Sequence, residues 1–184
     1  GNDNSEIRYI PPPHLTSDDI IKPKTEGQQA YWHGLNNSEN EMDFGIGPAG
    51  TGKTFMGIAK GIQLLARGDI KRLVMSRPAV EAGEKIGFLP GEAKEKVAPY
   101  LIPLFSSVTK IANGKFLEHC LTSEKIVIAP LAFIQGQTFD DAFMILDEAQ
   151  NCTFEQIYQV TTRAGENTRI LLTGDPRQIG RAHV

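Results

Sequence analysis

The sequence predicts an α/β fold in which a mostly parallel β-sheet is covered by helices on both faces. Two observations lead to this prediction. Short strand-like segments alternate with segments of helical periodicity along most of the chain. One strand-like segment, residues 143–147, is apolar almost throughout, as is typical of a parallel strand buried on both faces. Right-handed crossovers between such strands are then expected.

Five segments are expected to be strands and three to be helices. The strands are residues 42–46, 72–76, 125–129, 143–147 and 169–173. The helices are residues 53–66, 91–110 (interrupted by Pro99 and Pro103) and 154–164. Residues 1–24 contain three consecutive prolines and many polar side chains, so we expect an extended arm outside the core. The domain itself is expected over residues 25–178.

Composition restricts the class of protein. A length of 184 residues suits one domain with a real core, and no apolar run approaches the roughly 20 residues that cross a bilayer. The N-terminus lacks a basic-then-apolar signal, which favours a cytoplasmic protein. Cys120 and Cys152 are far apart and match no metal or disulfide pattern, so we expect reduced thiols. The net charge of −3 gives no indication of nucleic-acid binding.

The first chemical motif is a phosphate-binding loop. The pattern G-x-x-x-x-G-K-[ST] is matched by Gly47, Pro48, Ala49, Gly50, Thr51, Gly52, Lys53 and Thr54. Its glycines let the backbone curl, so that N–H groups face a phosphate at the start of a helix. We expect Lys53 to reach the β- and γ-phosphates and Thr54 to bind Mg²⁺. A chance match on a loop is the alternative, but the flanking strand-like and helical segments favour nucleotide binding.

Two further apolar strands end in polar residues, and the carboxyl ends of parallel strands meet at one edge of the sheet. Asp147 and Glu148 follow the first strand. We expect Asp147 to hold Mg²⁺ opposite Thr54, and Glu148 to orient and deprotonate the attacking water. The second strand leads through Gly174 to Gln178, whose amide would contact the γ-phosphate or that water. A solvated acidic turn and a plain Gly-Asp-Pro turn are the alternatives.

These motifs resemble those of known ATPases. Residues 147–150 and 174–178 look like motifs II and III of superfamily 1 helicases. The PhoH family of phosphate-starvation-associated ATPases is resembled more closely, over about residues 22 to 178, through the segments 45–54, 77–84, 87–91, 129–133 and 145–151. The resemblance implies a RecA-like P-loop NTPase domain, a three-layer α/β/α sandwich, with ATP and Mg²⁺ as ligands and RNA or single-stranded DNA as a partner.

The resemblance also suggests roles for single residues. Gln28 matches an upstream glutamine that reads adenine, although it could instead be an ordinary glutamine at a helix start. Arg77 is expected to meet a phosphate of ATP or of a nucleic acid, or alternatively to pair with Glu81 or Glu84. Arg163 matches a family position to which we assign no role.

A contact loop for a nucleic-acid strand is expected at residues 136–138, with Phe133 or Phe139 stacking on bases, unless these rings belong to the core. An isolated domain also lacks a secure arginine finger. The resemblance implies that a neighbouring subunit of a hexameric ring, or a lost C-terminal part, supplies it.

The family pattern continues past residue 178, whereas residues 179–184 read like a translated sequencing adapter. We therefore expect C-terminal truncation and a non-native tail at 179–184.

Three functions are compatible with these features. The first is an ATPase coupled to RNA or single-stranded DNA, which is helicase-like. The second is a nucleotide-dependent binding or assembly module without motor activity, and the third is a small-molecule kinase. The Asp-Glu pair and the Gly-Asp-x-x-Gln motif favour activation of water, and therefore an ATPase, over transfer of phosphate to a metabolite.

Overall fold

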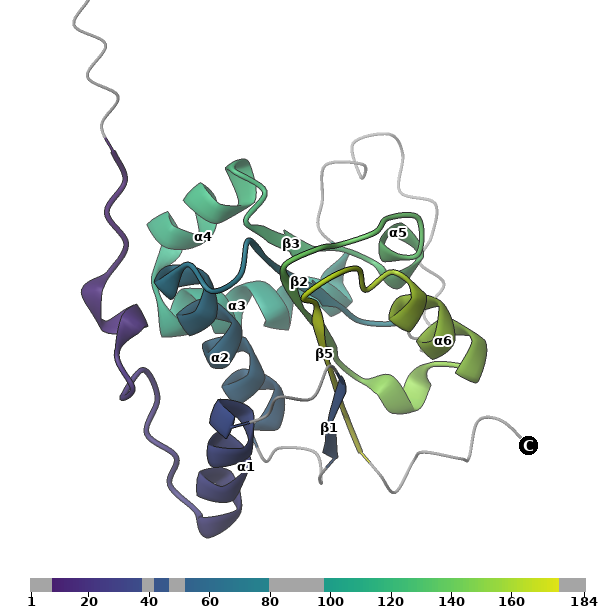
Figure 1. Ribbon diagram of the computed structural model, residues 1–184, viewed down its shortest axis with the longest axis horizontal. Helices are drawn as coiled ribbons and strands as arrows, with labels where there is room; N and C mark the ends of the chain where they lie inside the picture. The colour runs from purple at the N-terminus through teal and green to yellow at the C-terminus, as the bar shows by residue number, and fades with distance from the viewer. Residues whose placement is uncertain (1–7, 38–41, 47–51, 80–97, 176–184) are drawn as a thin grey trace, which may run out of the picture.

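A five-stranded parallel sheet forms the centre of the computed structural model, which describes residues 8–37, 42–46, 52–79 and 98–175 (Figure 1). The strand order is β1-β5-β4-β2-β3, and every neighbouring pair is parallel. The strands are β1 (Met42–Ile46), β2 (Arg72–Ser76), β3 (Ile126–Ile128), β4 (Ala142–Leu146) and β5 (Arg169–Gly174). The predicted α/β fold with a parallel sheet is therefore confirmed.

Helices cover both faces of this sheet. One face carries α1 (Glu26–Asn37), α2 (Lys53–Arg67), α3 (Ile102–Ile111) and α4 (Gly114–Thr122), and the other carries α5 (Leu131–Ile134) and α6 (Phe154–Thr162) (Figure 1). Alternate residues of β2, β3, β4 and β5 enter opposite cores, because side chains along a strand point alternately to opposite faces. In β4, Phe143 and Ile145 pack under α2, whereas Met144 and Leu146 pack on the α5–α6 side. The three-layer arrangement follows from this alternation.

Two glycines of helix α2 pack directly on the sheet. Gly57 and Gly61 are one turn apart and face Leu171 and Leu73, which an added Cβ atom at either glycine would overlap. These small residues therefore allow the close approach. The approach holds the start of α2 firmly against the carboxyl edge of the strands.

The five predicted strands and the predicted helices at 53–66 and 154–164 are present, with boundaries that differ by up to two residues. The described part of the predicted 91–110 helix is α-helical only from Ile102, after a 3₁₀ turn at Pro99–Leu101. Three helices, α1, α4 and the short α5, were not predicted. Start signals for α1 and α4 are nevertheless in the sequence: Thr25 and Gln28 form a reciprocal capping box, and Asn113 accepts a hydrogen bond from the Phe116 N–H. No side chain caps α5. The part of the predicted 91–110 helix before residue 98 lies outside the described residues.

The segment before α1 contributes to the core. Its short 3₁₀ helix η1 (Pro13–Thr16) buries Leu15 completely, and the Gln63 side chain of α2 donates a hydrogen bond of 2.8 Å to the Ser17 carbonyl. His14 Nε2 lies 2.7 Å from the Ile111 carbonyl oxygen. The expectation that residues 1–24 lie outside the core is therefore wrong for this part, because proline-rich composition does not reveal a single buried leucine.

Candidate active site

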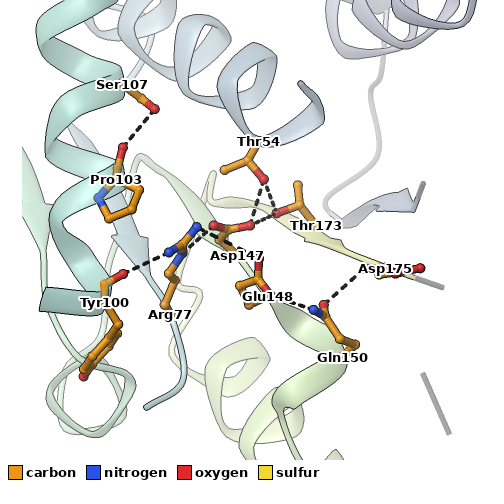
Figure 2. Close-up of polar contacts among 10 residues, drawn as sticks. All are labelled: Thr54, Arg77, Tyr100, Pro103, Ser107, Asp147, Glu148, Gln150, Thr173 and Asp175. Atoms are coloured by element: carbon orange, nitrogen blue, oxygen red, sulfur yellow. Dashed lines mark hydrogen bonds and ion pairs between the residues drawn. The ribbon is translucent and has the colours of Figure 1, made fainter. Parts of the chain in front are cut away.

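Thr54, Asp147 and Thr173 meet at the carboxyl edge of the sheet (Figure 2). The Thr54 hydroxyl donates to Asp147 Oδ1 at 2.8 Å and lies 2.9 Å from the Thr173 hydroxyl. Thr173, at the end of β5, also donates to Asp147 Oδ1 at 2.9 Å. The structure thus brings together the two residues predicted to bind Mg²⁺. The role of Thr173 was missed, because only the strand order shows that β5 lies between β1 and β4.

The start of α2 has the properties of an anion site. Gly52 precedes the helix with a left-handed φ of 74°, which glycine adopts without strain, and no side chain caps the helix there. Its first turn contains no acidic residue, so the N–H groups and the helix dipole favour a negative group. Lys53 Nζ lies 5.5 Å from the centre of the Tyr31 ring, and burial lowers the pKa of this lysine.

Glu148 follows Asp147 in an unusual backbone conformation. Its φ is 57°, in the left-handed region that a glutamate rarely adopts. The Gln150 amide donates a hydrogen bond of 2.6 Å to Glu148 Oε2, and Gln150 Oε1 accepts one of 3.1 Å from the Asp175 N–H. Gln150 is buried and therefore joins the acidic turn to the exit of β5. No role was predicted for Gln150 from the sequence, although it lies only two residues after Glu148.

We expect Gly174→Ala to destabilise the domain by about 1–3 kcal/mol, the usual cost of overpacking. An added Cβ atom would overlap Gln150 Oε1 and lie 3.2 Å from the backbone nitrogens of Ala149 and Gln150, which cannot move aside easily. Urea unfolding of the two proteins measures the difference. Gly34→Ala is the control for an added methyl group without overlap, because a Cβ atom at Gly34 has nothing within 4 Å. Since Gly34 lies inside α1, this change should raise the stability by about 0.5–1 kcal/mol. Equal midpoints for Gly174→Ala and the parent would show that the turn adjusts freely.

Arg77 contacts both Asp147 and Glu148. It follows β2, and the register of β2 with β4 places residue 77 beside residue 147. Its Nε donates to Asp147 Oδ2 at 2.6 Å, and its Nη1 donates to the Tyr100 carbonyl at 3.0 Å. Its Nη2 lies 4.0 Å from Glu148 Oε1. The described acidic partners of Arg77 are thus the two acids that follow β4, which neither of the predicted alternatives included. Glu81 and Glu84 lie outside the described residues.

The donor atoms at this site fit a magnesium ion. Mg²⁺ prefers oxygen ligands and is usually held by one or two protein side chains together with phosphates and water. Thr54 and Asp147 offer a hydroxyl and a carboxylate whose oxygens lie 2.8 Å apart, beside the anion site of α2. Among the described residues there is no cluster of three or more His, Cys, Asp or Glu side chains that could by itself hold a metal ion.

Comparison with known proteins identifies the family. The sequence model of the family described as "PhoH-like protein" matches residues 20–183, which is most of the chain. The chain belongs to the PhoH-like protein family. The match includes residues 179–183, so it does not support a foreign origin for them, and that origin stays a prediction.

Several PhoH-like relatives are similar over most of this chain. It is 46% identical over 159 residues to the PhoH-like protein of Bacillus subtilis (strain 168), covering 86% of this chain and 49% of the relative. It is 43% identical to the PhoH-like protein of Mycobacterium tuberculosis (strain H37Rv), covering 86% and 45%. For the protein PhoH of Escherichia coli (strain K12) the identity is 38%, with the same coverage of 86% and 45%. The chain spans about half the length of the curated relatives it matches.

One solved structure also resembles this PhoH-like chain. It is the large terminase from the thermophilic bacteriophage D6E, with a TM-score of 0.48 and 12% sequence identity, over 83% of this chain and 39% of that chain.

Gln28 of the PhoH-like domain lies beside the start of α2. Its Oε1 accepts hydrogen bonds from the N–H groups of Lys24 (2.8 Å) and Thr25 (3.3 Å), so the helix-start role is present. Its Nε2 lies 3.8 Å from where a Cβ atom on Gly52 would stand. A pocket of about 550 Å³ opens here, lined also by Phe55. The structure therefore brings Gln28 to the start of α2, while its contact with a base stays a prediction.

The two phenylalanines proposed for base stacking differ in exposure. Phe139 is buried, with 1% of its surface exposed, and belongs to the core. Phe133 on α5 is 54% exposed and stays a candidate for base stacking.

Arg163 follows the last residue of α6, and its Nε atom is buried without a hydrogen-bond partner among the described residues. Burial raises the pKa of Cys120 to about 11 and that of Cys152 to about 12, which makes both thiols unreactive at neutral pH.

Some predicted site residues lie outside the described residues. They are Gln178 and the first five residues of the phosphate-binding loop, which are Gly47, Pro48, Ala49, Gly50 and Thr51. In the described part of the chain, no helix is both long and apolar enough to cross a membrane.

Proposed function

We propose that this chain binds ATP with Mg²⁺ and hydrolyses it to ADP and phosphate. One observation carries the proposal: the Thr54 hydroxyl and the Asp147 carboxylate lie 2.8 Å apart at the start of the helix that follows the phosphate-binding motif. Two motifs separated by more than 90 residues in sequence thus share one point in space. Membership of the PhoH-like family agrees with this proposal.

The described side chains divide the proposed reaction between them. The N–H groups at the start of α2 and the Lys53 ammonium bind the phosphates and neutralise charge that develops during transfer. Thr54 and Asp147 would hold Mg²⁺, which supplies further positive charge at the β- and γ-phosphates. Glu148 accepts a proton from the attacking water, and Gln150 fixes the direction of its carboxylate through the 2.6 Å hydrogen bond. Gln178 is proposed to contact the γ-phosphate.

The pocket beside Gln28 is proposed to receive the adenine base. It adjoins Gly52, so a nucleotide whose phosphates lie at the start of α2 has its base within reach of it. Phe55 offers an apolar surface there, and the Gln28 amide offers polar atoms at the rim. A preference for ATP over GTP in competition binding, lost in Gln28→Ala, supports this assignment.

Coupling to RNA or single-stranded DNA is the finer part of the proposal. Phe133 supports it, because α5 follows β3 and the Phe133 ring is 54% exposed. Exposed aromatic rings bind unpaired bases by stacking.

The arginine finger is proposed to come from a neighbouring subunit of a hexameric ring, since Arg77 is already paired with Asp147. A cytoplasmic location and a link to phosphate starvation are proposed from the family alone.

Steady-state ATP hydrolysis with and without single-stranded RNA tests the function. We expect slow turnover by this chain alone and faster turnover with RNA, because an absent arginine finger costs roughly 10³–10⁵ in rate. Phe133→Ala should lose the stimulation and keep the basal rate. Nucleotide binding without turnover, with or without RNA, in a version as long as the relatives would favour the binding-module alternative. Fast turnover by a proven monomer would contradict the need for a finger in trans.

A further inference from the structure

Asp147 is contacted from two sides. On one side, the Thr54 and Thr173 hydroxyls donate to Oδ1; on the other, Arg77 Nε donates to Oδ2 at 2.6 Å (Figure 2). Only 5% of the Asp147 side chain is exposed, and 21% of the Arg77 side chain. The pair is therefore largely shielded from water, and its charges interact more strongly than a surface pair would.

A carboxylate buried to this extent needs a compensating positive charge. The two hydroxyls are neutral and supply hydrogen bonds only. Arg77 supplies the charge, and its position is fixed by a second hydrogen bond, of 3.0 Å, to the Tyr100 carbonyl in the 3₁₀ turn η3 (Pro99–Leu101) that leads into α3. A lysine would keep the charge, but its single ammonium group cannot reproduce the planar pair of contacts.

We propose that Arg77 is a positioning residue that serves as the internal counter-ion of Asp147 and thereby limits how tightly the site binds Mg²⁺. This inference rests on the proposed nucleotide site. A divalent ion held by Thr54 and Asp147 draws on the same carboxylate as Arg77, and the two cations repel each other. Removing the arginine leaves Asp147 unpaired when no metal is bound, and makes Mg²⁺ its main source of positive charge. Mg²⁺ with nucleotide therefore stabilises such a variant more than it stabilises the parent.

The test measures thermal unfolding of the parent, Arg77→Gln and Arg77→Lys, first in EDTA with ADP and then over a titration of Mg²⁺ at constant ADP. In EDTA we expect Arg77→Gln to unfold about 5–10 °C below the parent, as breaking a buried ion pair does in a chain of this size. Saturating Mg²⁺-ADP should recover much of that difference. The Mg²⁺ concentration for half-maximal stabilisation should fall about tenfold, from the loss of one repelling charge in a partly buried site. Arg77→Lys keeps the charge and should stay within about twofold of the parent.

Arg67→Gln is the matched control. Arg67 also joins a carboxylate and a backbone carbonyl, through contacts of 2.9 Å to Asp18 Oδ1 and 2.9 Å to the Thr16 oxygen, but it lies at the far end of α2. The unfolding temperature of Arg67→Gln should lie below that of the parent by the same amount with and without Mg²⁺. If Arg77→Gln behaves in the same way, Arg77 has only a structural role and the proposal is wrong.

The remaining outcomes are also decisive. If Arg77→Gln is unfolded in EDTA, its refolding by Mg²⁺-ADP supports the proposal, and a tighter Mg²⁺ site in Arg77→Lys overturns it. A parent protein that gains no stability from Mg²⁺-ADP would overturn the proposed nucleotide site itself. A parent that is stabilised, with unchanged Mg²⁺ dependence in Arg77→Gln, would overturn only the role of Arg77.

Discussion

Lys53→Ala is expected to lower the affinity for ATP by about 100-fold and to abolish measurable hydrolysis. The ammonium group stands at the start of α2, where the helix N–H groups already favour a phosphate. A charge-assisted hydrogen bond to phosphate is worth about 1.5–3 kcal/mol, which corresponds to that loss. Burial lowers the pKa of this lysine because it disfavours the charged ammonium. A negatively charged phosphate beside the ammonium offsets that cost. Isothermal titration calorimetry with Mg²⁺-ATP measures the affinity.

Lys71→Ala is the control for this experiment. Lys71 is 80% exposed and pairs with Asp141 at the opposite end of the strands, so its loss should leave ATP affinity unchanged. Circular dichroism of both variants establishes that the fold is kept. If Lys53→Ala and Lys71→Ala bind ATP equally well, the phosphate site does not lie at the start of α2.

Glu148→Gln is expected to keep ATP affinity near that of the parent and to slow hydrolysis by about 10²–10⁴-fold, the range for loss of a general base. The amide has the shape of the carboxylate but cannot take a proton from water. Its oxygen can still accept the hydrogen bond from Gln150, so the acidic turn should keep its geometry. Single-turnover assays with labelled ATP measure the chemical step, and filter binding measures the ATP that is retained.

Glu155→Gln provides the comparison, because Glu155 is an exposed acid on α6 outside the site. It should hydrolyse ATP at the parent rate. Hydrolysis by Glu148→Gln at that same rate would remove Glu148 as the base. Loss of ATP binding in Glu148→Gln would instead show that the change has disturbed the site as a whole.

The strands and the helix α2 were predictable because their signals are local: apolar runs for the buried strands and the glycine-rich motif for the start of α2. The meeting of Thr54 with Asp147 was predictable as well, since parallel strands present their carboxyl ends together. The partner of Arg77 was not, because it depends on β2 lying next to β4 in a particular register. Neither strand order nor register is encoded in any one segment.

The core contribution of Leu15 illustrates a second limit. Composition describes a segment as a whole, and residues 1–24 are mostly polar with several prolines. The two buried apolar residues described there, Leu15 and Ile20, belong to the core but leave no periodic pattern. The helix α1 was missed for a different reason, since its capping residues were present but its apolar positions are few.

Because β5 runs between β1 and β4, the strand before the phosphate-binding motif and the strand before the acids share no hydrogen bond. Two interstrand spacings, or about 10 Å, therefore separate their ends. The Thr173 side chain lies in that interval, within hydrogen-bond distance of both Thr54 and Asp147. The residue at position 173 thus acts as a spacer between the two motifs: a bulkier side chain would force them apart, and a glycine would remove both hydrogen bonds.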